Sequence, residues 1–301
     1  SATCPNTVLT YAGPTMVEGP WVIKANAKTS TSLAGSLVAW NWQFTAPDGT
    51  TRPLWSQETP DDIVAIATLV GTWTLCLTVA DSAGNQSCQP ACQQFEVQTK
   101  AAVHLELVWD TPTDPDPFDE GPAAGADLDL HLAHPLASGP DLDGDGVGDP
   151  WFNFPFDTFW FNANPSWFVS PAGKALPQHD PYLDMDDADG AGPELLDFTP
   201  PPDQSHTFAL GVHSWSDHGY GPSTATLRIY VNGVLTWQPK QVLQPRDMWR
   251  SGALVWTAGQ NSQPPTVAFV PCVGVTCLTP CYSNPAFDQQ MGAGMPPCKK
   301  P

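Results

Sequence analysis

An acidic loop near the middle of the chain has side chains spaced for cation binding. Residues 141–149 read Asp-Leu-Asp-Gly-Asp-Gly-Val-Gly-Asp, with acids at positions 1, 3, 5 and 9 and glycine at position 6. This spacing matches the first part of a calcium loop, in which alternate acids around a glycine turn converge on one ion. The alternative is an acidic turn without metal. The predicted calcium ligands are Asp141, Asp143, Asp145, Val147 and Asp149.

This loop departs from an EF-hand after its first nine residues. Position 12 is Phe152 rather than glutamate, and Pro150 prevents the helix that should follow. The loop instead resembles the shorter calcium loops of thrombospondin type-3 repeats and dockerins. That resemblance implies calcium as the bound ion.

A second group of acids lies between residues 184 and 194. Five carboxylates within eleven residues, interleaved with glycine, would repel one another strongly without a cation. We therefore predict a second cation site that draws on this segment. Its acids are Asp184, Asp186, Asp187, Asp189 and Glu194.

The acids are concentrated in one part of the chain. The whole sequence has 31 acidic and 11 basic residues and a net charge of −20. Residues 101–220 hold 22 of the acids and one base, Lys174, so this part alone carries −21. Such self-repulsion destabilises a compact fold unless cations neutralise it. It also disfavours nucleic acids and anionic membranes as partners.

The histidines give little support for an enzyme. The segment from His213 to His218 could serve a metal-dependent hydrolase, with Asp217 orienting a ring, but polar loop residues are the simpler interpretation. The sequence contains no zinc-protease, nucleophile-elbow or phosphate-loop motif. We predict a non-enzymatic protein, and we keep a hydrolase that uses His213 and His218 as an alternative.

The stretch after the first acidic loop is rich in aromatic residues. It runs from Trp151 through Trp160 and Phe161 and continues to Trp167 and Phe168. Exposed rings could form a glycan platform, with Trp151, Trp160 and Trp167 as its members, or a protein interface. We favour a small satellite core under a long loop.

Residues 1–100 alternate apolar and polar residues in short runs between turns, which predicts a β-sandwich. Two of these segments resemble a polycystic-kidney-disease (PKD) domain, which has an immunoglobulin-like fold. They are residues 40–44 (Trp-Asn-Trp-Gln-Phe) and residues 71–84, in which a strand that begins with glycine leads into an Asp-Ser-Ala-Gly turn. The chain departs from that family at residues 46–49, where Ala-Pro-Asp-Gly replaces the usual Gly-Asp-Gly loop. The resemblance implies a non-catalytic spacer or interaction module of a secreted protein.

A second, acidic β-sandwich is predicted over residues 101–260, with a long insertion at 135–180. The last strand is expected near residues 253–257, followed by a Pro- and Cys-rich tail at 261–301. The fold class is therefore all-β, with two sandwich modules and a tail pinned by disulfides. The strands are expected at 103–109, 126–132, 206–213, 223–231 and 234–237.

Residues 103–257 resemble the YfaP-like bacterial domains, β-sandwiches of no settled activity. The resemblance rests on Asp127-Leu-Asp-Leu-His131, on the Gly-Pro-Glu segment that ends at Glu194, and on the strand that reaches His213. The insertion at 135–180 departs from that family. The resemblance implies a sandwich with a bound metal, and its second-site candidates are Asp127, Asp129, Asp184, Asp186, Asp187 and Glu194.

Eight cysteines lie at the two ends of the chain, four in each. An even number in an acidic chain rich in Pro and Trp favours disulfides and an oxidising compartment, and we expect pairing within each end. Cys76 can reach Cys88 across a tight hairpin, which would leave Cys92 for Cys4 or another partner. The eight are Cys4, Cys76, Cys88, Cys92, Cys272, Cys277, Cys281 and Cys298.

Together these features predict a secreted protein, extracellular or on a bacterial cell surface. The longest nearly apolar run, residues 64–73, is too short to span a bilayer, and the start at Ser1 is typical of a processed form. The expected role is structural or adhesive, as a calcium-stabilised subunit of an appendage or matrix. The expected partners are other extracellular proteins or further copies of the chain, with glycans as the alternative.

Overall fold

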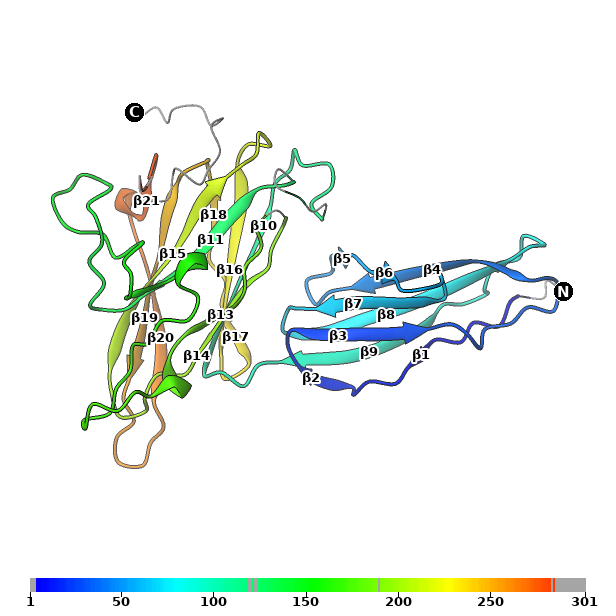
Figure 1. Ribbon diagram of the computed structural model, residues 1–301, viewed down its shortest axis with the longest axis horizontal. Helices are drawn as coiled ribbons and strands as arrows, with labels where there is room; N and C mark the ends of the chain where they lie inside the picture. The colour runs from blue at the N-terminus through cyan, green and yellow to red at the C-terminus, as the bar shows by residue number, and fades with distance from the viewer. Residues whose placement is uncertain (1–3, 119–120, 122–123, 189, 283, 285–301) are drawn as a thin grey trace. The chain divides into compact units, whose positions relative to one another are not determined.

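The computed structural model describes the chain apart from residues 1–3, 119–120, 122–123, 189, 283 and 285–301. It divides into two compact units, Ser1–Lys100 and Ala101–Pro301. Both units are built from β-sheets, and the only helices among the described residues are three short 3-10 turns (Figure 1). These turns are η1 (Trp160–Asn162), η2 (Pro177–His179) and η3 (Val275–Cys277).

The first unit contains a four-stranded and a five-stranded sheet. Its pairings are antiparallel except for β2 with β9, which is parallel. The four-stranded sheet has the order β1 (Thr10–Tyr11), β3 (Trp21–Asn26), β7 (Asp62–Ala67) and β6 (Trp55–Ser56). The five-stranded sheet has the order β2 (Met16–Glu18), β9 (Ala91–Gln98), β8 (Gly71–Asp81), β4 (Leu37–Thr45) and β5 (Thr51–Arg52).

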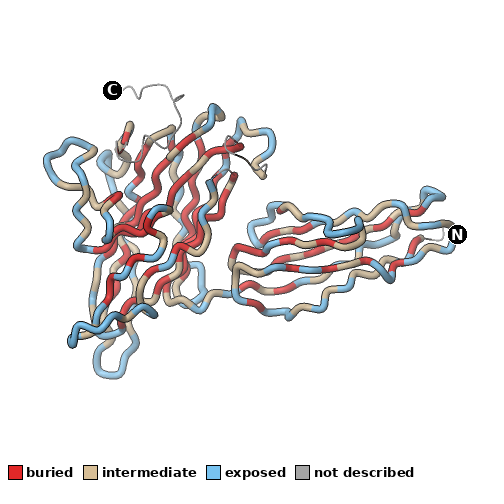
Figure 2. The backbone as a smooth tube through the Cα atoms, in the orientation of Figure 1, coloured by how far each residue is buried: buried red, intermediate tan, exposed pale blue. Residues whose placement is uncertain are grey.

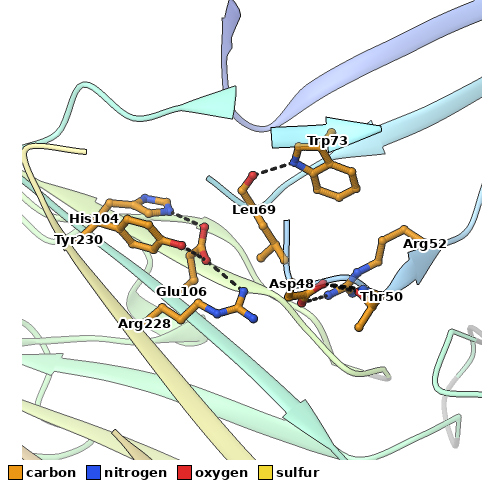
Figure 3. A network of polar contacts seen from close by, with 9 residues as sticks. All are labelled: Asp48, Thr50, Arg52, Leu69, Trp73, His104, Glu106, Arg228 and Tyr230. Atoms are coloured by element: carbon orange, nitrogen blue, oxygen red, sulfur yellow. Dashed lines mark hydrogen bonds and ion pairs between the residues drawn. The ribbon is translucent and has the colours of Figure 1, made fainter. Parts of the chain in front are cut away.

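Strand β8 shows why these residues form a sheet with one buried face. Its alternate residues from Trp73 to Val79 are fully buried, as expected when successive side chains point to opposite faces. The Trp73 indole N–H donates to the carbonyl oxygen of Leu69 at 2.8 Å (Figure 3). The turn that departs from the PKD pattern is closed by Asp48, which accepts the Thr50 N–H at 3.0 Å.

The disulfides of the first unit correct one expected pairing. Cys76 bonds to Cys92, not to Cys88, and Cys4 bonds to Cys88. The reason is register, because Cys76 and Cys92 are directly opposite each other on β8 and β9. Pairing within the N-terminal end is confirmed.

The cysteines near the other end also pair as expected where they are described. Cys272 bonds to Cys277, and Cys281 is disulfide-bonded too. Cys298 lies outside the described residues. No described cysteine is free.

The second unit is a sandwich of two six-stranded sheets. One core cluster joins them, with Leu105 and Leu227 from the first sheet and Leu130, Leu210 and Leu254 from the second. Figure 2 shows that the buried residues of this unit are concentrated in its strands. The first sheet has the order β13 (Tyr182–Met185), β14 (Glu194–Phe198), β10 (Val103–Asp110), β16 (Ser223–Val231) and β17 (Val234–Trp237), and β18 (Lys240–Leu243) also pairs with β16. The second sheet has the order β12 (Asp157–Thr158), β11 (Asp127–Ala133), β15 (His206–Ser216), β19 (Met248–Thr257) and β20 (Thr266–Pro271), and β21 (Leu278–Thr279) also pairs with β19.

Two elements of this unit differ from the sequence prediction. The expectation of a last strand at 253–257 is wrong, because β20 pairs with β19 along six residues and β21 pairs with it as well. Prolines at 264, 265 and 271 obscured β20, which lies outside β19 in the sheet order, where proline is tolerated. The insertion also contributes a strand, β12, which pairs with β11.

A polar network occupies the face of β10 that points away from the core (Figure 3). His104 Nδ1 lies 2.6 Å from Asp197 Oδ1 on β14. His104 Nε2 lies 3.4 Å from Glu106 Oε1, a contact that Figure 3 shows. Glu106 Oε2 accepts the Tyr230 hydroxyl at 3.1 Å and lies 3.4 Å from Arg228 Nη1. The network therefore ties β10 to the strands on both sides of it.

The His104 ring gives this network a pH dependence. Burial disfavours the charged ring, but the bonds to Asp197 and Glu106 outweigh burial and raise the pKa of His104 from 6.5 to about 9. A raised pKa in the folded state stabilises the fold fully below pH 6.5, and this contribution is lost as the pH rises through about 9.

We therefore expect the free energy of unfolding to fall by about 2–3 kcal/mol between these two pH values because of His104. Denaturant titrations across that range measure it. His104→Gln should flatten the dependence, and the matched variant His218→Gln, at an exposed loop residue, should keep it. An equal slope in wild type and His104→Gln would contradict the assignment.

Candidate metal centre

Two segments far apart in sequence meet along one edge of β11. That strand pairs with β12 only at Leu132 and Ala133, so its earlier residues lack a strand on that side. The loop between β13 and β14 lies there instead. Ala126 forms a bridge with Gly190, and the Leu130 N–H donates to the Glu194 carboxylate.

The sequence around this edge directs acidic side chains toward it. On β11, Leu128 and Leu130 enter the core, so Asp129 points to the opposite face. Glu194 begins β14 and is fully buried. Just before it, Gly192 has a φ of +77°, and a Cβ there would lie 2.7 Å from the Leu107 carbonyl oxygen. Only glycine fits this close approach, which explains the Gly-Pro-Glu pattern.

Asp129, Asp186 and Glu194 form a single group of carboxylates. One oxygen from each lies within 4.8 Å of the others. Asp129 and Glu194 are 2% and 0% exposed, whereas Asp186 is exposed. Asp129 Oδ2 and Glu194 Oε1 are buried without a hydrogen-bond partner among the described residues. Buried acceptors are nearly always satisfied, so this group has the character of a cation site.

The charges of this group oppose one another. Burial raises the pKa of Glu194 well above its ordinary value, and the charge of Asp129 and then a side-chain hydrogen bond with Asp186 raise it further. Burial likewise raises the pKa of Asp186. Either a proton or a cation must therefore relieve the repulsion. Three carboxylates are hard oxygen ligands, which suit calcium or magnesium better than a soft metal.

The two histidines expected to bind a ligand do not join this group. His213 is fully buried, and its Nδ1 lies 3.6 Å from Asp129 Oδ2, beyond hydrogen-bond distance. The His213 Nε2–H donates to the Tyr282 carbonyl oxygen at 3.0 Å. His218 is exposed in the loop after β15, and its Nδ1–H donates to the Gly125 carbonyl oxygen at 2.8 Å.

A cavity of about 230 Å³ opens directly beside the carboxylates. Asp127, Asp129 and Asp186 line it together with Ala188 and two indoles, Trp160 and Trp215. The indoles meet edge to face, with ring centroids 5.6 Å apart. Trp215 was not singled out from the sequence, although it lies two residues after His213, whose position on β15 is opposite Asp129.

Most of the aromatic insertion forms a core rather than a platform. Trp151 and Phe159 are buried in a satellite cluster with Tyr282, and Trp167 belongs to the main core. The alternative of Trp151 and Trp167 as exposed stacking residues is therefore wrong, since both residues are buried. Trp160 is the exception, because it is half-buried and lines the cavity.

A buried hydrogen bond between His131 and Asp157 fastens this insertion to β11. His131 Nδ1 lies 2.7 Å from Asp157 Oδ2, and the Phe152 N–H donates to the same oxygen at 2.6 Å. Both side chains of the pair are fully buried. This enclosure holds the insertion in place beside the carboxylate group.

The loop at 141–149 forms a second, more exposed group. Oxygens of Asp141, Asp143 and Asp149 lie within 4.8 Å of one another. Asp141 accepts the N–H groups of Gly144 and Gly146 at 2.7 and 2.9 Å. Asp145 accepts the N–H of Val147 at 2.7 Å, and Val147 is exposed. Since the loop's own N–H groups already bind these acids, calcium there stays a prediction.

Among the described acids of the second segment, Asp184 and Asp187 are not members of the group of three carboxylates. Asp184 is on β13, where burial and then Asp197 raise its pKa. Asp187 packs near Gly190, and Asp189 lies outside the described residues.

Comparison with known proteins leaves the family open. No family model matches the chain, and no curated protein matches it. One solved structure comes from work on the promiscuous specificity of carbohydrate-binding modules of the β-sandwich superfamily. Its alignment covers 81% of this chain and 100% of that chain, with 13% sequence identity and a TM-score of 0.27. Likeness at this level carries no argument about function, and the PKD and YfaP resemblances stay predictions.

Neighbouring aromatic rings of the insertion differ in burial, and this difference allows a test of how the insertion packs. Phe159→Ala should lower the free energy of unfolding by about 3–5 kcal/mol, because the ring is fully buried. Phe161→Ala should change it by less than about 0.5 kcal/mol, because that ring is exposed. Chemical denaturation measures both, and equal effects would show that the insertion does not pack as described.

Proposed function

We propose that this chain is a calcium-stabilised, non-enzymatic protein of the cell surface or extracellular space with a structural or adhesive role. The observation that carries the proposal is the convergence of Asp129, Asp186 and Glu194. Two of these carboxylates are buried and keep an unpartnered oxygen. An ion held there links β11 of one sheet to β14 of the other, so it would stabilise the sandwich as a whole.

The choice of calcium follows from ligand type and setting. Calcium accepts six to eight oxygens in flexible geometry, so three carboxylates plus water or ligand oxygens satisfy it. Magnesium demands near-ideal octahedral geometry and releases water reluctantly. Extracellular calcium is also abundant enough to fill sites of modest affinity, and the excess of acids over bases in the second unit suits such an ion.

A secreted location is supported by the disulfides. Three are described, two in the first unit and one in the second. Bonds of this kind persist in oxidising compartments. None of the helices in the described parts of the chain has the length and apolar character needed to cross a membrane.

A non-enzymatic role is supported by the enclosure of the best acid–base pair. His131 and Asp157 resemble the base of a hydrolase and the acid that orients it, yet both are fully buried among aromatic rings. His131 stacks on Phe159 with ring centroids 5.2 Å apart. This packing suits a structural fastening, and we propose other extracellular proteins or copies of the chain itself as partners.

Calcium should raise the melting temperature of the second unit. With a dissociation constant near 0.1 mM and about 1 mM free calcium, one site contributes about 1.4 kcal/mol. For a domain of this size that corresponds to about 3–6 °C. Calorimetry with calcium and with EDTA measures the shift.

Variants assign the shift to the site. Asp129→Asn and Glu194→Gln should each abolish most of it, whereas Asp184→Asn, a matched change on β13 outside the group, should preserve it. Asp143→Asn reports any separate contribution of the exposed loop. A wild-type shift below about 2 °C would refute the structural role of calcium.

A further inference from the structure

The cavity beside the carboxylates combines two kinds of surface that seldom occur together. Asp129 and Asp186 line it and also belong to the cation group, so a bound ion borders the cavity. The indoles of Trp160 and Trp215 line it as well. Both rings are half-buried, so each keeps part of its surface accessible.

We propose that this cavity binds a single sugar residue of a glycan, with the ring stacked on Trp160 or Trp215 and neighbouring hydroxyls bound to the cation. The inference rests on the proposed cation and extends it from a structural ion to a ligand-binding one. Neither indole is needed to hold an ion, so the two parts can be tested separately.

The coordination of the ion leaves positions for a ligand. Asp129 and Glu194 hold it from the protein side, since both are buried, and Asp186 reaches it from the exposed side. Three carboxylates do not supply the six to eight oxygens that calcium accepts unless every one is bidentate. The open positions face the cavity that Asp129 and Asp186 line, where a pair of hydroxyls can replace two waters.

The chemistry of the lining selects a sugar over other ligands. A sugar offers vicinal hydroxyls on its edges and an apolar face of C–H groups, which matches a cation beside an indole. A purely apolar ligand would leave the carboxylates without partners. An organic cation would suit the indoles and acids alone but would be repelled by the bound ion.

The volume of the cavity and its remaining polar side chain fit one sugar ring rather than an extended oligosaccharide. The volume of about 230 Å³ is below the roughly 300–1,000 Å³ typical of sites for drug-sized ligands. Asp127, which is half-buried, is the further polar residue that lines the cavity. The rest of a glycan would extend into solvent.

The test uses the whole chain on an array of natural oligosaccharides, with calcium and with EDTA. We expect calcium-dependent retention of a set of glycans that share one terminal residue. The free oligosaccharide retained best is then titrated by calorimetry against wild type and variants. Trp215→Ala and Trp160→Ala should weaken binding by at least about tenfold, as for an aromatic anchor. Phe154→Ala, at an exposed ring of the same insertion, should leave it unchanged.

Terbium luminescence separates loss of the sugar from loss of the ion or of the fold. Terbium replaces calcium, and bound terbium is detected by direct excitation, which needs no tryptophan. Trp215→Ala should keep terbium affinity and the melting temperature of its calcium form within a few degrees of wild type while losing the glycan. Asp129→Asn should lose both ligands.

The outcomes discriminate between the two proposals. Terbium binding without retention of any glycan would overturn the sugar site and leave the structural ion standing. Glycan binding that survives EDTA would also overturn the sugar site. Absence of terbium binding in wild type would overturn both.

Discussion

The second unit depends on how it accommodates carboxylates at the junction of its two sheets. Asp129 and Glu194 are almost fully removed from water, where an unpaired ion costs several kcal/mol. Glu194 accepts the Leu130 N–H, but one oxygen of each residue has no hydrogen-bond partner among the described residues. We propose that a divalent cation satisfies these oxygens and joins the strands that carry them.

Other features of the second unit position side chains around the same group of carboxylates. Gly192 lets the chain pass against Leu107, so that Glu194 enters the interior at the edge of β11. The Asp157–His131 pair fastens the insertion over β11 and β15 and places Trp160 against Trp215. The structural elements that protect the ion therefore also shape the cavity beside it, which is why we link stability and recognition.

Local patterns in the sequence were enough to predict several of the strands and part of the candidate site. Alternation of apolar residues predicted β8, β10, β11 and β16, and the crowding of acids at 184–194 pointed to Asp186 and Glu194. Pairing across strands was not predictable in the same way. Cys76 was assigned to the nearer cysteine, Cys88, whereas register places it opposite Cys92. Trp215 went unnoticed because its contact with Trp160 depends on how the insertion at 135–180 folds back, which has no local signature.

The most direct test of the cation is its position. Crystals of the full chain grown with terbium should give an anomalous difference peak about 2.3–2.6 Å from carboxylate oxygens of Asp129, Asp186 and Glu194, since terbium takes the place and distances of calcium. That result would establish the ion on which this account rests. A map without a peak there, with Asp186 and Glu194 close enough to share a proton, would contradict it.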